Sequence, residues 1–283
     1  MIHSHGRFVW YELLTTEVEA AKAFYAEVVG WGTQKALTGG PAYILFTAQG
    51  ASVSGLTGLP DAARQSGLRP TWLGYIGVDD VDAAAARIER LGGAVYVPPT
   101  DVPNISRFSV AADPQMATIA VLKWMNGGQA LPCDLDAPGH VGWHELLATD
   151  WETAFAFYRD VFGWRKARSD AGAPSGYQLF SAGGQTIGGM FTKPATQPLP
   201  FWLYYFNVGD IDEATRRVKA AGGKIVNGPI EVLGSRWIVQ CTDPQDALFA
   251  LVGKRSHNGI GYFAPAPRKP PAGGANDPCS GLP

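Results

Sequence analysis

Hydrophobic and polar positions in the first part of the chain follow a strand pattern, then a helix pattern, then shorter strand patterns. Residues 8–14 are apolar and rich in residues that favour β-structure, which predicts a strand. Apolar residues then recur at helical spacing over 18–28, which predicts a helix that Thr16 caps and Gly30 ends. Two strand-like stretches follow, around 42–47 and 51–56. The pattern therefore predicts a unit of one strand, one helix and further strands.

A second unit of the same kind occupies the residues up to 123. An apolar run at 72–78 predicts its first strand, and Asp79 or Asp80 is expected to cap a helix over 81–91. Strand-like runs at 107–111 and 118–123 come after that helix. Strands and helices in this order are typical of an α+β fold built on βαβββ units.

The whole pattern occurs twice along the chain. The residues that recur 133 positions later are Trp10, Glu12, Phe24, Tyr25, Gly30 and Trp31. Asp113-Pro-Gln matches a second Asp-Pro-Gln that starts at Asp243. A repeat of this length predicts two tandem domains rather than a solenoid. We expect domains at 7–125 and 139–254, a turn-rich linker at 126–138, and a flexible tail rich in proline and glycine at 255–283.

Composition narrows the functional classes. Apolar residues make up 46% of the chain and charged residues 17%, so each half can bury a core. The net charge of −2 and the lack of a basic run argue against nucleic-acid binding. Three widely spaced cysteines do not suggest a disulfide scaffold, and the N-terminal residues do not resemble a signal peptide. No apolar run reaches the length of a membrane span, so we expect a cytoplasmic protein without membrane contact.

Three motifs together resemble those of a known family. They are Gly-Trp after a Phe-Tyr helix, Val-Asp-Asp-Val-Asp before the second helix, and Asp-Pro-Gln before a final strand. With them the chain is similar to the glyoxalase/bleomycin-resistance/dioxygenase superfamily over nearly all of 7–124 and 139–254. The nearest subgroup is that of tandem-domain bacterial glyoxalase-like proteins, often labelled hydroxylases. The resemblance implies the vicinal oxygen chelate (VOC) fold, in which two βαβββ modules curve around a cup that takes a small molecule.

The resemblance also implies one divalent metal per cup, held by His or Gln on first strands and Glu on last strands. The corresponding positions in this chain are Trp10, Trp143, Leu73, Leu203, Ala120 and Ala250. None of these side chains can bind a metal, and the segments 51–58 and 184–192 contain no acid or histidine. We therefore expect no metal and no other cofactor. Strand alternation places His144 on the opposite face of the strand from Glu145. We therefore expect His144 to face away from the cup and to be a hydrogen-bonded structural residue.

Two repeated glutamates are the candidate catalytic residues. Glu12 and Glu145 each follow a tryptophan by two positions, so they should share its face and point into a cup. A buried carboxylate needs a partner or a raised pKa. Arg107 and Arg236, each between a serine and an aromatic residue, are the expected partners. Either each Glu–Arg pair ties its domain together, or the glutamate is a general base and the arginine stabilises developing negative charge.

Aromatic residues are expected to line the cups and bind the ligand. They are Trp10, Tyr43, Trp72 and Tyr75 in the first half, and Trp143, Tyr177, Trp202, Tyr205 and Trp237 in the second. Such walls suit small, flat or partly apolar molecules. The alternative is that the rings fill the cups and leave no room for a ligand.

These observations predict a glyoxalase-like protein that binds or acts on a small organic molecule without the usual metal. As an enzyme it would be a metal-independent acid–base catalyst of the lyase, isomerase or hydroxylase-like kind. Two alternatives stay open: a metal-dependent glyoxalase or dioxygenase, and a protein that sequesters an antibiotic or metabolite as bleomycin-resistance proteins do. The tandem repeat can supply internally the partner that single-domain relatives obtain by dimerising, so we expect a monomer or a weak homodimer.

Overall fold

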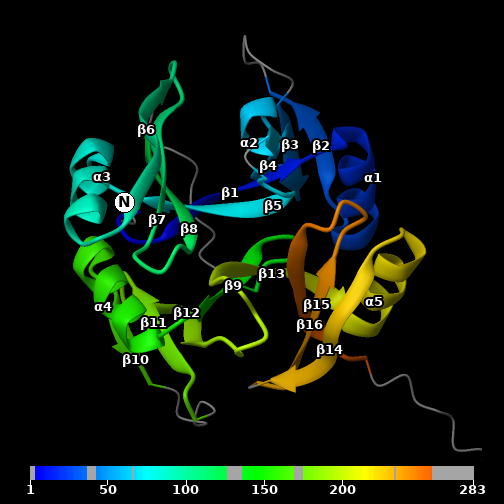
Figure 1. Ribbon diagram of the computed structural model, residues 1–283. Helices are drawn as coiled ribbons and strands as arrows, with labels where there is room; N and C mark the ends of the chain where they lie inside the picture. The colour runs from blue at the N-terminus through cyan, green and yellow to red at the C-terminus, as the bar shows by residue number, and fades with distance from the viewer. Residues whose placement is uncertain are drawn as a thin grey trace, which may run out of the picture.

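The first half of the chain forms a single eight-stranded mixed sheet (Figure 1). The computed structural model describes residues 4–36, 43–65, 67–125, 136–168, 175–232 and 234–256. Most of the predicted linker and tail, 126–135 and 257–283, lies outside these residues. No helix among the described residues combines the length and apolar character needed to cross a membrane.

Two βαβββ units build the first sheet. The first contains β1 (Phe8–Thr15), α1 (Val18–Val29), β2 (Gly32–Lys35), β3 (Ile44–Ala48) and β4 (Ala51–Gly58). After a short helix α2 (Asp61–Gln65), the second contains β5 (Thr71–Gly77), α3 (Val81–Arg90), β6 (Ala94–Val102), β7 (Ser106–Ala112) and β8 (Thr118–Trp124). The strand order is β2-β3-β4-β1-β5-β8-β7-β6, and the antiparallel pair β1–β5 joins the two units.

The second half repeats this arrangement. Its elements are β9 (Val141–Ala148), α4 (Trp151–Phe162), β10 (Arg165–Ala167), β11 (Gln178–Ala182), β12 (Gln185–Thr192), β13 (Phe201–Asp210), α5 (Ile211–Ala220), β14 (Lys224–Val232), β15 (Arg236–Thr242) and β16 (Leu248–Lys254). The sheet order β10-β11-β12-β9-β13-β16-β15-β14 matches that of the first half. The predicted α+β class with tandem paired modules is confirmed, and the strands of the two units pair within each half.

Local signals explain most helix ends. Asp80 caps α3 by accepting a hydrogen bond from a backbone N–H of the first turn, as expected. Gly30 ends α1 in the left-handed conformation, with φ of 85°. The expected Thr16 cap is wrong: α1 begins after Glu17, which makes no side-chain cap bond.

The sequence interpretation missed two strands, β2 and β6. Strand β2 has four residues, all exposed, so no apolar pattern marks it. Strand β6 contains Pro98-Pro99, which argues against a strand. It forms because it lies at the sheet edge, and its pairing with β7 skips between Val97 and Thr100.

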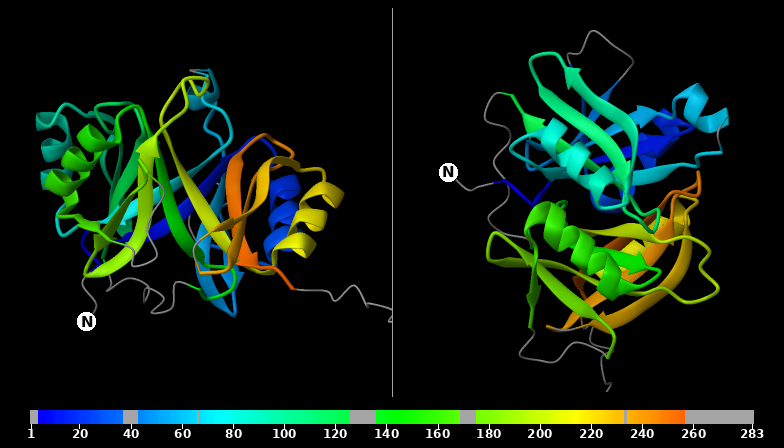
Figure 2. Two further views of the ribbon diagram at one scale, coloured as in Figure 1. Left: turned by 90° about the horizontal axis from the view of Figure 1, so that it is seen from below. Right: turned by 60° about the vertical axis from the view of Figure 1, so that its left-hand side comes forward.

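The two halves share one hydrophobic core. Helix α1 packs against α5 of the second half, and α4 packs against α3 of the first (Figure 2). Phe24 of α1, for example, lies edge-on to Phe249 of β16 at 5.7 Å between ring centroids. A continuous cluster of buried side chains runs through both halves. Because each half covers the sheet face of the other, we expect the two halves to unfold together.

Repeated motifs make the polar ties of this shared core. Tyr25 of α1 donates to Asp243 at 3.2 Å, and its repeat Tyr158 of α4 donates to Asp113 at 3.0 Å. The other carboxylate oxygen of each aspartate accepts two backbone N–H groups of its own turn. The Phe-Tyr and Asp-Pro-Gln motifs therefore recur because each half needs both to bind the other.

Equivalent residues of the two halves meet at the centre of the interface. Tyr11 and His144 occupy the same place in the repeat, and the Tyr11 oxygen lies 2.6 Å from His144 Nε2. His144 Nδ1 lies 2.6 Å from the Ile187 carbonyl oxygen, which can only accept, so Nδ1 carries the proton and Nε2 accepts from Tyr11. Burial lowers the pKa of His144 to about 4. The predicted structural role of His144, away from the cup, agrees with this placement.

A second pair at the interface shows why the halves differ. Gly74 and Tyr204 are equivalent, and the Gly74 N–H donates to the Tyr204 hydroxyl at 2.8 Å. A Cβ atom at Gly74 would overlap the Tyr204 ring. Two tyrosines could not occupy these positions together, so a small residue in one half makes room for a large one in the other.

Candidate functional site

The concave face of each sheet carries a row of equivalent side chains across its central strands. In the second half the row runs from Trp143 on β9 through Tyr205 on β13 and Ala250 on β16 to Gln240 on β15. Glu145 lies two residues along β9 from Trp143, on the same face. We call these two concave faces the first cup and the second cup.

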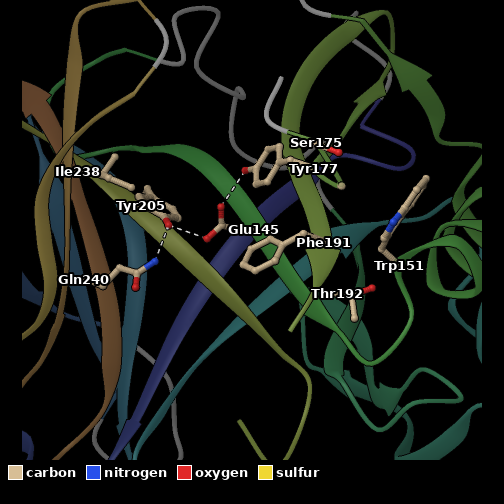
Figure 3. A pocket seen from close by; sticks show the side chains of 10 residues that line it. Glu145, Trp151, Ser175, Tyr177, Phe191, Thr192, Tyr205, Ile238 and Gln240 are labelled. Atoms are coloured by element: carbon tan, nitrogen blue, oxygen red, sulfur yellow. Dashed lines mark hydrogen bonds between the residues drawn. The ribbon is translucent and has the colours of Figure 1, made fainter. Parts of the chain in front are cut away.

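Hydrogen bonds join these residues into one network in the second cup (Figure 3). Tyr177 donates to Glu145 Oε1 at 2.8 Å, and Tyr205 donates to Glu145 Oε2 at 2.7 Å. The Trp143 indole donates to the Tyr177 oxygen at 2.9 Å. Gln240 Nε2 donates to the Tyr205 oxygen at 3.1 Å. Both oxygens of one buried carboxyl group are thus bound by phenols, and each phenol is itself held by a further donor.

The first cup contains the corresponding network. Tyr75 donates to Glu12 Oε2 at 2.7 Å, and the Trp10 indole donates to the Tyr43 oxygen at 3.0 Å. Tyr43 is the second hydrogen-bond partner of Glu12. The structure therefore places both glutamates in the cups, beside the tryptophans that precede them, where strand alternation predicted them.

Burial dominates the ionisation of these groups. It raises the pKa of Glu12 and of Glu145, and the hydrogen bonds from the tyrosines offset only part of the rise. Burial and the neighbouring carboxyl also raise the pKa of Tyr177 and Tyr205. The phenols therefore stay protonated as donors, and burial favours the protonated form of the carboxyl group in each network.

Two glycines make room for the phenols. A Cβ atom at Gly55 would overlap the Tyr43 ring, and a Cβ atom at Gly189 would overlap the Tyr177 ring. Gly55 lies directly opposite Glu12 in the sheet, and Gly189 lies opposite Glu145. Sequence reasoning missed these residues, although a glycine at equivalent places in both halves is a detectable signal of close approach.

A pocket of about 440 Å³ lies over the network in the second cup (Figure 3). Its lining consists of Glu145, Trp151, Ser175, Gly176, Tyr177, Phe191, Thr192, Tyr205, Ile238 and Gln240. Aromatic walls with a few converging polar groups suit a small, flat organic molecule that carries oxygen substituents. Among the lining residues, Glu145 is 7% exposed and carries the only carboxyl group.

The expected Glu–Arg pairs are wrong. Arg107 binds Asp82 at 2.7 Å and Asp101 at 2.9 Å. Arg236 donates to Asn207 at 2.7 Å and pairs with Asp136. The glutamates have tyrosine partners instead.

The Ser-Arg-aromatic match between the halves is one residue out of the register of the repeat, which explains this error. Phe108 lies opposite Leu122 in the first sheet, and Ile238 lies opposite Val252 in the second. Phe108 is therefore equivalent to Ile238, and Arg107 is equivalent to Trp237 rather than to Arg236. A shift of one residue in a strand turns every side chain to the other face.

Six of the nine predicted ligand-binding aromatics lie in the cups, and three do not. Those in the cups are Trp10, Tyr43, Tyr75, Trp143, Tyr177 and Tyr205. Trp72 and Trp202 lie on the opposite sheet face, where their indoles donate to the hydroxyls of Tyr25 and Tyr158. The ring of Trp237 stacks under the Arg255 guanidinium at 3.6 Å. Strand alternation excludes these three from the cups.

The side chains of the cups do not fit a divalent metal. The positions at which the resemblance implies ligands carry Trp10, Leu73 and Ala120 in one cup and Trp143, Leu203 and Ala250 in the other. Among the described residues of each hydrogen-bonded network, the glutamate is the only carboxyl group, and its neighbours are protonated phenols. The described residues contain no group of three or more His, Cys, Asp or Glu that could hold a metal ion. Metal ions in such folds need several nitrogen or oxygen ligands, which this set does not provide.

Comparisons with known proteins agree with this architecture. The model of the "Glyoxalase/Bleomycin resistance protein/Dioxygenase superfamily" matches residues 7–121 and 138–251. A Mycobacterium tuberculosis protein named "Putative glyoxylase CFP32" is 31% identical over 245 residues, 86% of this chain and 93% of that protein. "Anthracycline biosynthesis protein DauV" of Streptomyces sp. (strain C5) is 30% identical over 266 residues, 88% of this chain and 94% of that protein.

Solved structures show the same fold at lower identity. The Mn(II)-bound glyoxalase from Novosphingobium aromaticivorans superimposes with a TM-score of 0.58 at 18% identity, covering 89% of this chain and 82% of that one. Its resemblance concerns the fold alone. Together with the family match over both halves, these findings identify the chain as a member of the glyoxalase/bleomycin resistance protein/dioxygenase superfamily that carries two tandem VOC modules.

Proposed function

We propose that this protein binds a flat organic molecule bearing hydroxyl or carbonyl groups in the second cup and exchanges a proton with it through Glu145, without a bound metal. The observation that carries the proposal is the position of Glu145. Its carboxyl group lines the pocket, is held by two phenols, and has a pKa raised by burial.

A carboxyl group in this state suits general acid–base catalysis. Its raised pKa brings the protonated and ionised forms closer in population at neutral pH, which is the condition for efficient proton transfer. The phenols of Tyr177 and Tyr205 stabilise the ionised form, and they also fix the orientation of the carboxyl plane. A substrate proton on a hydroxyl group, or on a carbon next to a carbonyl, would pass to Glu145 and leave negative charge on the substrate oxygen.

The relatives support a small organic ligand. One is named a glyoxylase and another an anthracycline biosynthesis protein, and both align with this chain over nearly their whole length. The aromatic walls of the pocket, Tyr177, Phe191 and Trp151, agree with a flat molecule.

A ligand panel tests the proposal in two steps. Quenching of tryptophan fluorescence by naphthols, hydroxyquinones and aromatic ketones reports binding, because Trp151 lines the pocket. For each ligand that binds, incorporation of deuterium from D₂O at carbons next to its carbonyl or hydroxyl group then reports proton exchange by NMR. We expect Glu145→Gln to retain binding within about tenfold, the effect of one hydrogen bond, and to abolish exchange. Exchange that persists in this variant would remove the catalytic role of Glu145.

A second candidate, a binding protein without catalysis, is favoured by one observation. Both oxygens of Glu145 already accept phenol hydrogen bonds, so the network is complete without a substrate. In that case the wild-type protein would bind members of the panel and exchange no proton with any of them.

We also propose that residues 7–125 and 139–254 act as two domains of one monomeric unit. Each half already covers the convex sheet face of the other through α1 and α4, so no second chain is needed for that purpose. Analytical ultracentrifugation at micromolar concentration tests the oligomeric state, and a stable dimer would contradict it.

A further inference from the structure

Aromatic rings pack beside the Glu–Tyr network of the first cup. Trp124 lies edge-on to Trp10 at 5.9 Å between ring centroids, and Phe108 lies edge-on to Tyr75 at 6.3 Å. Trp10 is consequently only 6% exposed. The row of side chains ends in Val110, which is packed in the same apolar cluster. The network of the first cup thus ends against hydrocarbon.

The second cup differs at the equivalent positions. Strands β15 and β16 pair in the same register as β7 and β8, which gives the equivalent positions. At these positions Lys254 replaces Trp124, Ile238 replaces Phe108 and Gln240 replaces Val110. Without the two covering rings, Trp143 is half-buried where Trp10 is buried. The network of the second cup continues into an amide that lines the pocket.

Hydrogen bonds on both ends fix the orientation of this amide. Gln240 Nε2 donates to the Tyr205 oxygen at 3.1 Å, and Asn227 Nδ2 donates to Gln240 Oε1 at 3.4 Å. An amide nitrogen has two hydrogens, and Tyr205 takes one of them. Ala250, between the two strands, is too small to fill the space over which the amide reaches Tyr205. The second N–H of Gln240 is therefore available on the pocket wall.

A donor and an acceptor consequently stand together in the second cup. Gln240 Nε2 and Glu145 Oε2 both contact the same phenol oxygen of Tyr205, at 3.1 and 2.7 Å, so they lie no farther apart than these two distances combined. A ligand with a carbonyl oxygen beside a hydroxyl group can meet both: the carbonyl accepts from the amide and the hydroxyl donates to the carboxylate. The first cup lacks this amide donor, because Val110 occupies the position equivalent to Gln240.

We infer that Gln240 makes the second cup select molecules in which a carbonyl group adjoins a hydroxyl group. The inference rests on the proposed function, because it places its ligand in the same pocket. Gln240 is a specificity residue in this scheme: it binds the carbonyl oxygen and also holds Tyr205 in place as a donor to Glu145.

Two matched probes test the selectivity. 2-Acetyl-1-naphthol has a carbonyl beside its hydroxyl group, and 2-ethyl-1-naphthol has the same shape without the carbonyl oxygen. Isothermal titration of the full chain should show 2-acetyl-1-naphthol bound about tenfold more tightly than the ethyl compound, which is the effect of about one hydrogen bond.

Two variants locate that difference. Gln240→Met preserves the length of the side chain and removes the amide, so we expect it to lower affinity for the acetyl probe about tenfold and to leave the ethyl probe unchanged. Val110→Gln changes the equivalent position of the first cup and should alter neither affinity. The unfolding temperature of each variant, measured without probe, shows whether a loss of binding reflects a loss of structure.

The outcomes separate the inference from the proposed function. Equal affinity of the wild type for the two probes, or an equal loss of both affinities in Gln240→Met, would each overturn the inference. Failure of both naphthols to bind, while other members of the wider panel do bind, would overturn the inference and leave the proposed function intact. Failure of the whole panel would refute both.

Discussion

His144 joins the two halves as a neutral imidazole, and we predict that acid weakens the protein through this residue. Its ring stacks on Phe8 at 4.1 Å, and both of its nitrogens are bound within the interface, to Tyr11 and to the Ile187 carbonyl. Protonation would put a proton on Nε2, which now accepts from Tyr11, and a charge inside the core. Burial is the main reason that the folded protein resists this change, and the nearby charge of Arg7 adds to it.

The size of the effect follows from the lowered pKa. In the unfolded chain an imidazole takes up its proton as the pH falls below about 6.5, whereas in the folded protein His144 does so only near its pKa of about 4. The unfolded state therefore binds more protons over this interval, and stability falls as the pH falls. At 1.36 kcal/mol per pH unit, His144 should cost about 2.5 kcal/mol of unfolding free energy at pH 4.5 relative to pH 7.

Urea unfolding of the wild type and of His144→Gln at pH 7 and pH 4.5 measures this contribution. Carboxyl groups such as Glu12 and Glu145, whose pKa is raised, change stability in the opposite direction, but they do so equally in both proteins and cancel in the difference. We expect the wild type to lose about 2.5 kcal/mol more than the variant.

A control and a direct titration complete the test. Tyr11→Phe removes one hydrogen bond to His144 and keeps the titrating ring, so it should lower stability at pH 7 by about 1 kcal/mol and retain a steep loss in acid. An equal acid response of the wild type and His144→Gln, or an imidazole NMR titration of His144 centred near its ordinary value, would refute the reasoning.

Two further predictions concern the interface and the network. Tyr158→Phe removes the phenol that binds Asp113 in the buried interface, and we expect a loss of about 2 kcal/mol in urea unfolding, because the carboxylate oxygen is left without a partner; a loss below about 0.5 kcal/mol would contradict this tie. Gly189→Ala places a Cβ atom in the Tyr177 ring, so the ring must move from Glu145, and ligand affinity should fall about tenfold while the protein stays folded; unchanged affinity would show that the phenol is dispensable.

Much of the fold could be read from periodicity. The apolar, β-favouring run over β1 and the helical spacing over α1 each depend on which residues face a buried layer, and that information is local. The edge strands β2 and β6 carry no such signal, since few of their side chains are buried, and Pro98-Pro99 gives a local signal that the sheet edge overrides.

The candidate site divides in the same way. Trp10 and Glu12 share a strand, so their common face followed from alternation alone. The arginines failed because the Ser-Arg-aromatic match aligns the two halves one residue away from the register that strand pairing gives on both sides of the motif. Trp72 was misplaced for a related reason: its strand is apolar on both faces, so composition does not distinguish the cup from the interface between the halves.

The sequence by itself determined the duplication and the βαβββ units, because these depend on residue identity and short-range spacing. Only the tertiary structure decided what the repeated residues contact. It showed that Tyr25 and Tyr158 bind across the halves, that tyrosines rather than arginines hold the glutamates, and that the two cups differ at Val110 and Gln240. These partners come from strands and helices far apart in the chain, and no local pattern records which distant side chain will fill the space beside a buried carboxyl group.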